Sequence, residues 1–424
     1  MSVTVSPDKL DLSAYLRRGD RIVWSQACGE PSTLIETLIA QAQGIGDLSV
    51  FAATSFSGLL TPESVQHFRV ASMGAIGALR TLTAAGKLDI IPCHVSQIAP
   101  MIERGLIGCD VVFVQVSPAD AEGNHSFGLV NDFIQSAIAK ARIVIAEVND
   151  QVPYTLCDAT LPASKIDVAI HVSRPPVQVP PAKIGAGDQA IAKLAADYIE
   201  DGAVIQVGVG AVPDAILQLL RDRRDLGVHS GMVGDGLVDL VEAGVVTNAR
   251  KSIDPGVSIT GALIGSKRLY DFAHKNPNIA LRQSSYTHSD TTLAKLEKYV
   301  TINSAIEVDL TGQVNAEQSG DQYLGGTGGQ VDYVRAGMRS PGGWSIIALP
   351  ATAKGGKISR ITTALAGPVT TARSEVDVIV TEFGAAELRG QSLAERARRL
   401  VAIAHPDFRE ELDNTARNIA QRGF

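Results

Sequence analysis

The feature that most constrains the fold is a regular alternation of short apolar runs with segments of helical periodicity. The runs Val111–Val116 and Ile143–Val148 are almost uninterrupted, as in strands that are buried on both faces. The segment between them, Ile134 to Lys140, has helical spacing. This alternation recurs along the chain and predicts an α/β fold with mostly parallel sheets covered by helices.

A proline-rich stretch divides the chain into two halves. It places four prolines within the seven positions 175–181, which favours an extended connector because proline cannot continue a helix. The alternation restarts beyond it, with a helix candidate from Ile184 to Ile199 that has a polar face and a strand from Ala203 to Val207. We therefore predict an N-terminal domain over 1–182 and a C-terminal domain over 183–424.

Composition excludes several classes of protein. The net charge of −7 over 424 residues argues against nucleic acid as a partner, because proteins that bind it carry basic faces. No apolar run approaches the ~20 residues of a membrane helix, and no signal peptide is recognisable at the start. The four cysteines lack C-x-x-C spacing and the histidines are isolated, so we expect no metal site, free thiols and a cytoplasmic protein.

Two glycine-rich segments are candidate ligand loops. Gly208-Val209-Gly210 lies between a predicted strand and a predicted helix that carries Pro213 in its first turn. Its N–H groups can hold a phosphate or an oxyanion, although the third glycine of a nucleotide-binding fingerprint is absent. The stretch 325–329 packs four glycines into five positions, which lets the backbone approach a flat or anionic group. The alternative for each is an ordinary surface turn.

Several polar residues next to predicted strands have two interpretations. Glu307 lies in the strand predicted for Ala305 to Leu310, where it can serve as a general base or nucleophile, or lie on a solvated strand face with Asp309. Glu147 and Asp150, at the end of another strand, are equally ambiguous. Ser117 to Gly128 suggests the edge of a cleft, and Ser32 is a candidate cap for the helix that follows it.

These motifs together resemble the acetyl-CoA hydrolase/transferase family, and within it the 4-hydroxybutyrate CoA-transferase-like branch. The resemblance runs from about Gly19 to about Phe408. The segments that carry it include Gly29-Glu30-Pro31, 146–153, Gly208 to Asp214, 265–272, Gly328 to Asp332, 369–373, 380–384 and 404–408.

The resemblance implies two CoA-transferase-type domains, assembled as a homodimer or a larger homo-oligomer. It implies acyl-CoA as the substrate, a carboxylate as a possible acceptor, and no tightly bound cofactor. In active transferases of the family a glutamate attacks the thioester and becomes a glutamyl-CoA thioester. The expected CoA contacts in this chain are Gly208, Val209, Gly210, Ala211, Val212, Gly328, Gly329 and Lys354, and Asp332 follows two of them.

The chain departs from the family pattern at one position. Where that pattern reads His-Ser-Glu-Met, this sequence has Gly231 between Ser230 and Met232, and glycine cannot act as a nucleophile. Three interpretations follow: a hydrolase with Glu307 or Glu30 as general base, a transferase in which Glu307 replaces the missing glutamate, or a non-catalytic acyl-CoA binder. We expect hydrolase-like chemistry.

Overall fold

The computed structural model describes residues 3–423. The chain forms two compact units, which are described separately. Unit 1 contains residues 1–180, 231–235 and 257–289, and unit 2 contains 181–230, 236–256 and 290–424. The chain first passes from unit 1 to unit 2 between Pro180 and Pro181, inside the proline-rich stretch, and two later segments return to unit 1.

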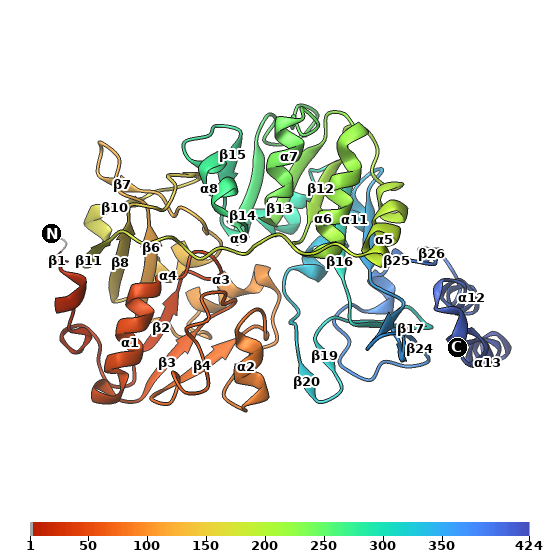
Figure 1. Cartoon of the computed structure of the whole chain (residues 1–424), viewed down its shortest axis with the longest axis horizontal. Helices are drawn as coiled ribbons and strands as arrows, with labels where there is room; N and C mark the ends of the chain where they lie inside the picture. The colour runs from red at the N-terminus through yellow and green to blue at the C-terminus, as the bar shows by residue number, and fades with distance from the viewer. Residues whose placement is uncertain (1–2, 424) are drawn as a thin grey trace. The chain divides into compact units, whose positions relative to one another are not determined.

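Unit 1 is built on an eight-stranded sheet in the order β1-β11-β8-β6-β2-β3-β4-β5 (Figure 1). All of its neighbouring strands are parallel. The strands are β1 (Val3–Val5), β2 (Arg21–Trp24), β3 (Leu48–Phe51), β4 (Phe68–Ser72), β5 (Asp89–Ile90), β6 (Val111–Val116), β8 (Ile143–Asn149) and β11 (Val168–Val172).

Helices cover both faces of this sheet. Helices α1 (Ser32–Ile45) and α2 (Leu79–Ala84) share one apolar core with Ile22, while α3 (Val95–Glu103) and α4 (Ile134–Lys140) share another with Val23. Successive strand residues point to opposite faces, so the two cores lie on the two sides of the sheet. Unit 1 also holds β7 (Asn124–His125), β9 (Leu156–Cys157), β10 (Leu161–Pro162), β14 (Ser258–Leu263), β15 (Ile279–Leu281), α8 (Lys267–Ala273) and α9 (Ser284–Thr287).

Unit 2 carries a second sheet, in which the order is β26-β25-β21-β16-β12-β13. Its pairs are parallel except for the antiparallel edge pair β25–β26. The expected α/β class with mostly parallel sheets is confirmed in both units. The strands are β12 (Val204–Val207), β13 (Gly227–Val233), β16 (Tyr299–Ser304), β21 (Trp344–Ala348), β25 (Val378–Thr381) and β26 (Gly384–Glu387). The last three residues of β13 belong to unit 1.

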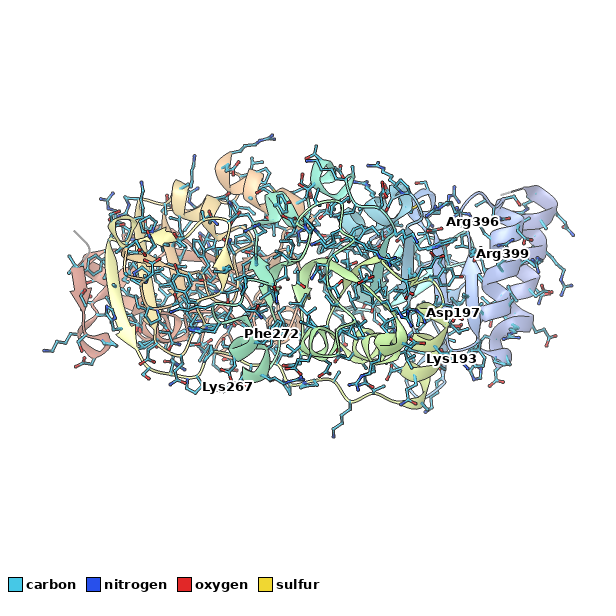
Figure 2. The ribbon with its side chains drawn as sticks, turned by 90° about the horizontal axis from the view of Figure 1, so that it is seen from above. Lys193, Asp197, Lys267, Phe272, Arg396 and Arg399 are labelled. Atoms are coloured by element: carbon cyan, nitrogen blue, oxygen red, sulfur yellow. The ribbon has the colours of Figure 1, made fainter. Side chains whose placement is uncertain are left out.

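The first helix of unit 2 is amphipathic, as the sequence predicts for the segment Ile184 to Ile199. On α5 (Ala186–Ala196) the apolar Ile191 and Ala195 are buried, whereas Lys193 and the following Asp197 lie on the exposed side, where Figure 2 labels them. The other helices are α6 (Ala211–Leu219), α7 (Gly236–Glu242), α10 (Asp290–Leu293), α11 (Gln330–Arg339), α12 (Leu393–Ile403) and α13 (Arg409–Arg422).

Short strands extend unit 2 beyond the end of its sheet. β17 (Glu307–Asp309) pairs with β18 (Val314–Asn315) and β24 (Ile361–Thr362). Two hairpins are formed by β19 (Gln318–Ser319) with β20 (Gln322–Tyr323) and by β22 (Thr352–Ala353) with β23 (Ile358–Ser359). The strand expected over Ala305 to Leu310 is therefore shorter than predicted. No helix within residues 3–423 is long and apolar enough to cross a bilayer.

Candidate functional site

Strand order marks one candidate ligand-binding edge in unit 2. The first strand of its sheet, β12, lies between β13, which follows it in the sequence, and β16, which comes later. The order of strands thus reverses between β12 and β16, and open α/β sheets bind ligands beyond the carboxyl ends of the strands at such a point. The loop Gly208–Gly210 leaves the sheet there.

The two glycines of this loop have free space beside their backbone. A Cβ placed on Gly208 or Gly210 would meet no heavy atom within 4 Å among the described residues. Gly210 has φ 134° and directly precedes α6, and no side chain caps that helix in the part of the chain described. Pro213 has no N–H, and the N–H of Asp214 donates to the carbonyl oxygen of Gly210 at 2.9 Å, which leaves the N–H groups of Ala211 and Val212 as the donors for an anion at this helix end. Ala211 is half-buried and Val212 is buried, so the two residues anchor the start of the helix.

The neighbouring strand end supplies polar groups to the same edge. Asn303 of β16 donates from Nδ2 to Oε1 of Gln206 on β12, at 3.4 Å. Strand pairing places Gln206 opposite Thr301 and Val207 opposite Ile302. The side-chain amides of Gln206 and Asn303 therefore lie next to the end of β12, where the Gly208–Gly210 loop begins.

The second glycine-rich stretch combines packing and exposure. A Cβ on Gly325 would lie 2.2 Å from the carbonyl oxygen of Ala316, so this glycine is required by close backbone packing. Gly328 adopts φ 53° and Gly329 precedes the first residue of α11, and both are half-buried. Asp332 is buried in the first turn of that helix. Lys354 lies at the exposed turn of the β22–β23 hairpin, with φ 49°.

Glu307 is held by a turn. Its Oε1 accepts hydrogen bonds from the N–H of Ala366 at 2.9 Å, from the N–H of Gly367 at 3.1 Å and from Nδ2 of Asn315 at 2.9 Å. The side chain is half-buried. Asp309 is buried and binds the turn that follows β17, so these two carboxylates do not lie together on a solvated strand face.

Glu30 has a different environment in unit 1. It follows β2, which lies between β3 and β6 where the strand order of that sheet reverses. The side chain is fully buried, and Oε2 accepts the N–H groups of Phe56 at 2.9 Å and Ser57 at 2.8 Å. Oε1 has no hydrogen-bond partner among the described residues. Burial raises the pKa of Glu30, and the neighbouring Ser55 hydroxyl together with the N–H groups of Ser57 and Phe56 offsets this only in part.

The segment around Gly231 belongs to unit 1. Gly231 is half-buried on β13, and its carbonyl oxygen lies 2.9 Å from the position of a Cβ on Gly261. Asp235 accepts from the backbone N–H of Ser266 at 2.9 Å and from its hydroxyl at 2.7 Å. A Cβ on Gly265 would be 2.8 Å from the Asp235 carboxylate. Asp235 therefore fixes the start of α8 and holds the backbone beyond Gly231.

The predicted site residues fall in both units. Unit 2 holds Glu307, Lys354 and the two glycine segments, whereas Glu30 and Gly231 are in unit 1. The predicted cleft-edge segment contributes Pro118, Ala119 and His125 to a pocket of about 400 Å³ in unit 1. No group of three or more potential metal ligands occurs within the described residues.

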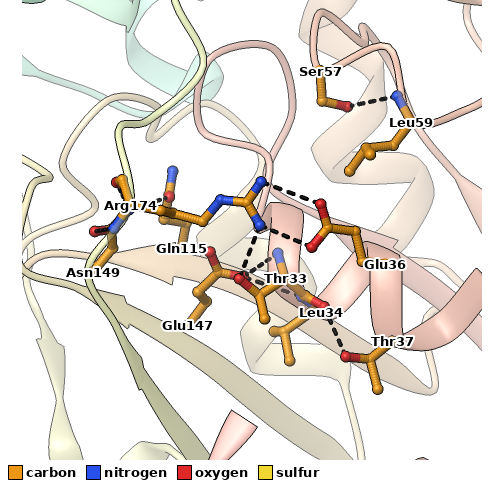
Figure 3. Close-up of polar contacts among 10 residues, drawn as sticks. All are labelled: Thr33, Leu34, Glu36, Thr37, Ser57, Leu59, Gln115, Glu147, Asn149 and Arg174. Atoms are coloured by element: carbon orange, nitrogen blue, oxygen red, sulfur yellow. Dashed lines mark hydrogen bonds and ion pairs between the residues drawn. The ribbon is translucent and has the colours of Figure 1, made fainter. Parts of the chain in front are cut away.

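Glu147, which the sequence left ambiguous, closes the N-terminus of α1 in unit 1. Its Oε2 accepts the N–H groups of Thr33 at 2.8 Å and Leu34 at 3.1 Å, while Arg174 binds the Thr33 hydroxyl at 3.2 Å (Figure 3). Burial raises the pKa of Glu147 to about 7. The expected cap by Ser32 is wrong: Pro31 occupies the cap position. A carboxylate of the protein thus occupies this helix end, whereas no side chain caps α6 in the part of the chain described.

The fold and this edge define a CoA-transferase-type α/β protein, and comparison with known sequences gives the family. The acetyl-CoA hydrolase/transferase N-terminal domain matches residues 9–181, and the corresponding C-terminal domain matches residues 265–416. The chain belongs to the acetyl-CoA hydrolase/transferase family and is an enzyme of that family.

Individual relatives agree with this assignment. The chain is 41% identical over 398 residues to the 4-hydroxybutyrate coenzyme A transferase of Clostridium kluyveri, covering 93% of each chain. The crystal structure of RipA from Yersinia pestis aligns with a TM-score of 0.93 and 33% identity over 99% of this chain and 98% of that one. The 4-hydroxybutyrate CoA-transferase of Porphyromonas gingivalis aligns with a TM-score of 0.85, 33% identity and the same coverage.

Proposed function

We propose that this protein binds an acyl-CoA thioester and hydrolyses it. The observation that carries hydrolysis rather than transfer is Gly231 in the position where the family pattern has its nucleophilic glutamate. With no side chain at that position, a covalent glutamyl-CoA intermediate cannot form there, and water becomes the natural acceptor of the acyl group.

Binding of CoA is assigned to the open edge of unit 2. The N–H groups at the start of α6 and the bare backbone of Gly208–Gly210 favour a phosphate or a developing oxyanion. Val209, Ala211 and Val212 complete this loop, and Gly328, Gly329 and the exposed Lys354 are further proposed contacts. The loop has the physical properties that the motif requires, namely accessible donors and no obstructing side chain.

Glu30 is the proposed general base. Its raised pKa makes the ionised carboxylate a stronger base than an exposed glutamate, and Oε1, which has no hydrogen-bond partner among the described residues, is the oxygen proposed to take the proton. The carboxylate takes a proton from water, and the oxygen attacks the thioester carbon. The C–S bond then breaks, and CoA leaves as a thiolate that accepts a proton. Glu307 is a weaker candidate, since three donors already bind one of its oxygens.

CoA transfer is the second candidate function. It is supported by 41% identity to a CoA transferase over 93% of the chain. In this case a carboxylic acid accepts CoA, and Glu307 is the residue proposed to replace the missing nucleophile. We also propose, from the family resemblance, a homodimer or larger homo-oligomer in the cytoplasm, which light scattering on the purified protein and localisation of a tagged chain would test.

The test is a panel of short, branched and bulky acyl-CoAs, each incubated with the protein with and without acetate. Release of free CoA without acetate is the result expected of a hydrolase. Formation of acetyl-CoA only when acetate is present would establish transfer instead. If neither product forms with any member of the panel, the chain is a binder and the proposal is wrong.

A further inference from the structure

Unit 2 contains an unusual charged group beside the proposed CoA-binding edge, the guanidinium of Arg360. This residue lies between β23 and β24, and its backbone is fixed on both sides. Its N–H donates to the carbonyl oxygen of Ala351 at 2.9 Å, and its carbonyl oxygen accepts from the N–H of Val308 at 2.8 Å. Arg360 is therefore held rigidly just beyond the ends of β16 and β21.

One side of the guanidinium is already bound. Nη1 donates to the carbonyl oxygen of Ala305 at 3.3 Å, immediately after the last residue of β16. The opposite side is not bound: Nε is buried with no hydrogen-bond partner among the described residues, and Nη2 has none in that part of the chain either. The Nε–Nη2 edge thus presents two parallel donors, which is the fork that matches a carboxylate.

The charge is also uncompensated within the described chain. Arg360 makes no ion pair with any described acid, and burial lowers its pKa. Glu382 is near enough to favour the charged form, but it accepts the N–H of Ala351 at 2.8 Å. A partly buried cation without a counter-ion is costly unless something supplies the anion. No described carboxylate supplies it through a direct ion pair with Arg360.

We propose that Arg360 is a specificity-determining residue that binds a carboxylate of the substrate acid through Nε and Nη2. The inference rests on the proposed acyl-CoA chemistry and adds a substrate class to it. The carboxylate has two possible sources: the far end of a dicarboxylic acyl group, or a free acid that acts as acceptor. Lys354 and Lys357 are exposed on the adjoining hairpin. These two lysines, rather than Arg360, are the proposed partners of the CoA phosphates.

The experiment compares wild type with Arg360→Met, Arg360→Lys and the control Arg417→Met. Arg417 is an exposed arginine on α13 that pairs with Asp413. Each protein is assayed with succinyl-CoA and with butyryl-CoA, which have the same chain length and differ in the terminal group. The KM for acetate is measured wherever exchange occurs. Binding of free CoA and of free succinate is measured by calorimetry.

If the acyl end supplies the carboxylate, Arg360→Met raises the KM for succinyl-CoA roughly 10- to 100-fold and leaves butyryl-CoA within about threefold of wild type. If the acceptor supplies it, the KM for acetate rises by the same factor instead. Arg360→Lys recovers part of the loss because it keeps the charge without the fork. In both cases free CoA binds normally.

Three results would overturn the inference: an equal loss for both acyl-CoAs, weaker binding of free CoA, or no change in any arm. The second of these would mean that Arg360 binds a CoA phosphate. Absence of turnover in wild type would refute the proposed function and not this inference, because calorimetry with free succinate tests Arg360 directly. In that case, succinate binding that is unchanged in Arg360→Met, or absent from wild type, rejects the carboxylate site.

Discussion

Glu147 Oε2 accepts the backbone N–H of Thr33 at 2.8 Å, so a carboxylate from one strand of the unit 1 sheet occupies the first turn of α1. A helix N-terminus attracts anions because its N–H groups lack partners and the helix dipole is positive there. In unit 1 the carboxyl group of Glu147 supplies the hydrogen-bond acceptor for these N–H groups (Figure 3). In unit 2 the corresponding end of α6 begins at Gly210 without a side-chain cap in the described chain, which leaves it for a ligand.

Replacement of Glu30 tests the proposed base. Glu30→Gln keeps an oxygen for the N–H groups of Phe56 and Ser57 but removes the proton acceptor, so turnover should fall at least ~100-fold with folding retained. The measurement is the rate of CoA release from the best acyl-CoA of the panel. Glu63→Gln, at an exposed glutamate of the same unit, is the matched control. Turnover near the wild-type rate in Glu30→Gln would reject the base.

The pH profile gives a second signature of Glu30. Because burial raises its pKa, the rate kcat/KM should rise with pH through a value above that of an ordinary glutamate, since only the ionised form accepts a proton. Profiles of kcat/KM for wild type and Glu30→Gln would be compared over the same range. If kcat/KM falls at low pH in the same way in both proteins, a group other than Glu30 causes that fall.

Replacement of Glu307 separates the two candidate functions. Glu307→Gln preserves an oxygen that can accept from Ala366 and Gly367, so the hydrolase account predicts turnover within about threefold of wild type. If Glu307 were the nucleophile, the same variant would lose exchange by orders of magnitude, because an amide does not attack a thioester. Acyl-CoA exchange in the presence of acetate is the readout.

Substitution of Gly208 tests whether CoA binds close to the backbone of the Gly208–Gly210 loop. A methyl group there meets no described atom within 4 Å, so Gly208→Ala should fold with a free energy of unfolding within about 1 kcal/mol of wild type. If the CoA moiety comes close to this backbone, the KM for acyl-CoA should rise about tenfold or more. Gly210→Ala is the strained comparison, because φ 134° disfavours any side chain. An unchanged KM in Gly208→Ala would place CoA elsewhere.

The pKa of Glu147 predicts how stability depends on pH. Burial raises this pKa to about 7, above the roughly 4.3 of an unfolded glutamate. The folded state therefore binds more protons between these values, and the free energy of unfolding falls as pH rises through this window. Glu147→Gln keeps an acceptor for α1 but does not ionise, so above pH 7 it should exceed wild type in stability by about 1–3 kcal/mol.

Urea unfolding of both proteins at pH 5 and pH 8 measures the effect. Asp132, whose pKa burial also raises to about 7, is present in both proteins and cancels in the comparison. An identical loss of stability between the two pH values in wild type and variant would show that Glu147 does not contribute.

The sequence predicted the sheets well, because their strands are continuous apolar runs. Val111–Val116 and Ile143–Asn149 form β6 and β8 nearly as expected, since burial on both faces leaves a strong local signal. The cap of α1 was not predictable in this way. Its donors and Glu147 are more than a hundred positions apart, so local rules favoured Ser32 instead.

The sequence predicted only those parts of the candidate site that consist of residues adjacent in the chain. The Gly208–Gly210 loop carries its own signal, namely glycines between a strand and a helix. Whether Glu307 has a free oxygen depends on Ala366 and Gly367, and the unbound edge of Arg360 depends on Ala305. These contacts join residues that are distant in the sequence, so the residues next to Glu307 and Arg360 do not predict them.

In the proposed reaction water, and not a carboxylate, accepts the acyl group. The most direct measurement is a reaction in ¹⁸O-labelled water without acetate, with mass spectrometry of both the released acid and the protein. Hydrolysis gives free CoA, one labelled oxygen in the acid and no CoA adduct on the chain. Release that requires acetate, together with a CoA adduct on a glutamate, would contradict hydrolysis and establish transfer.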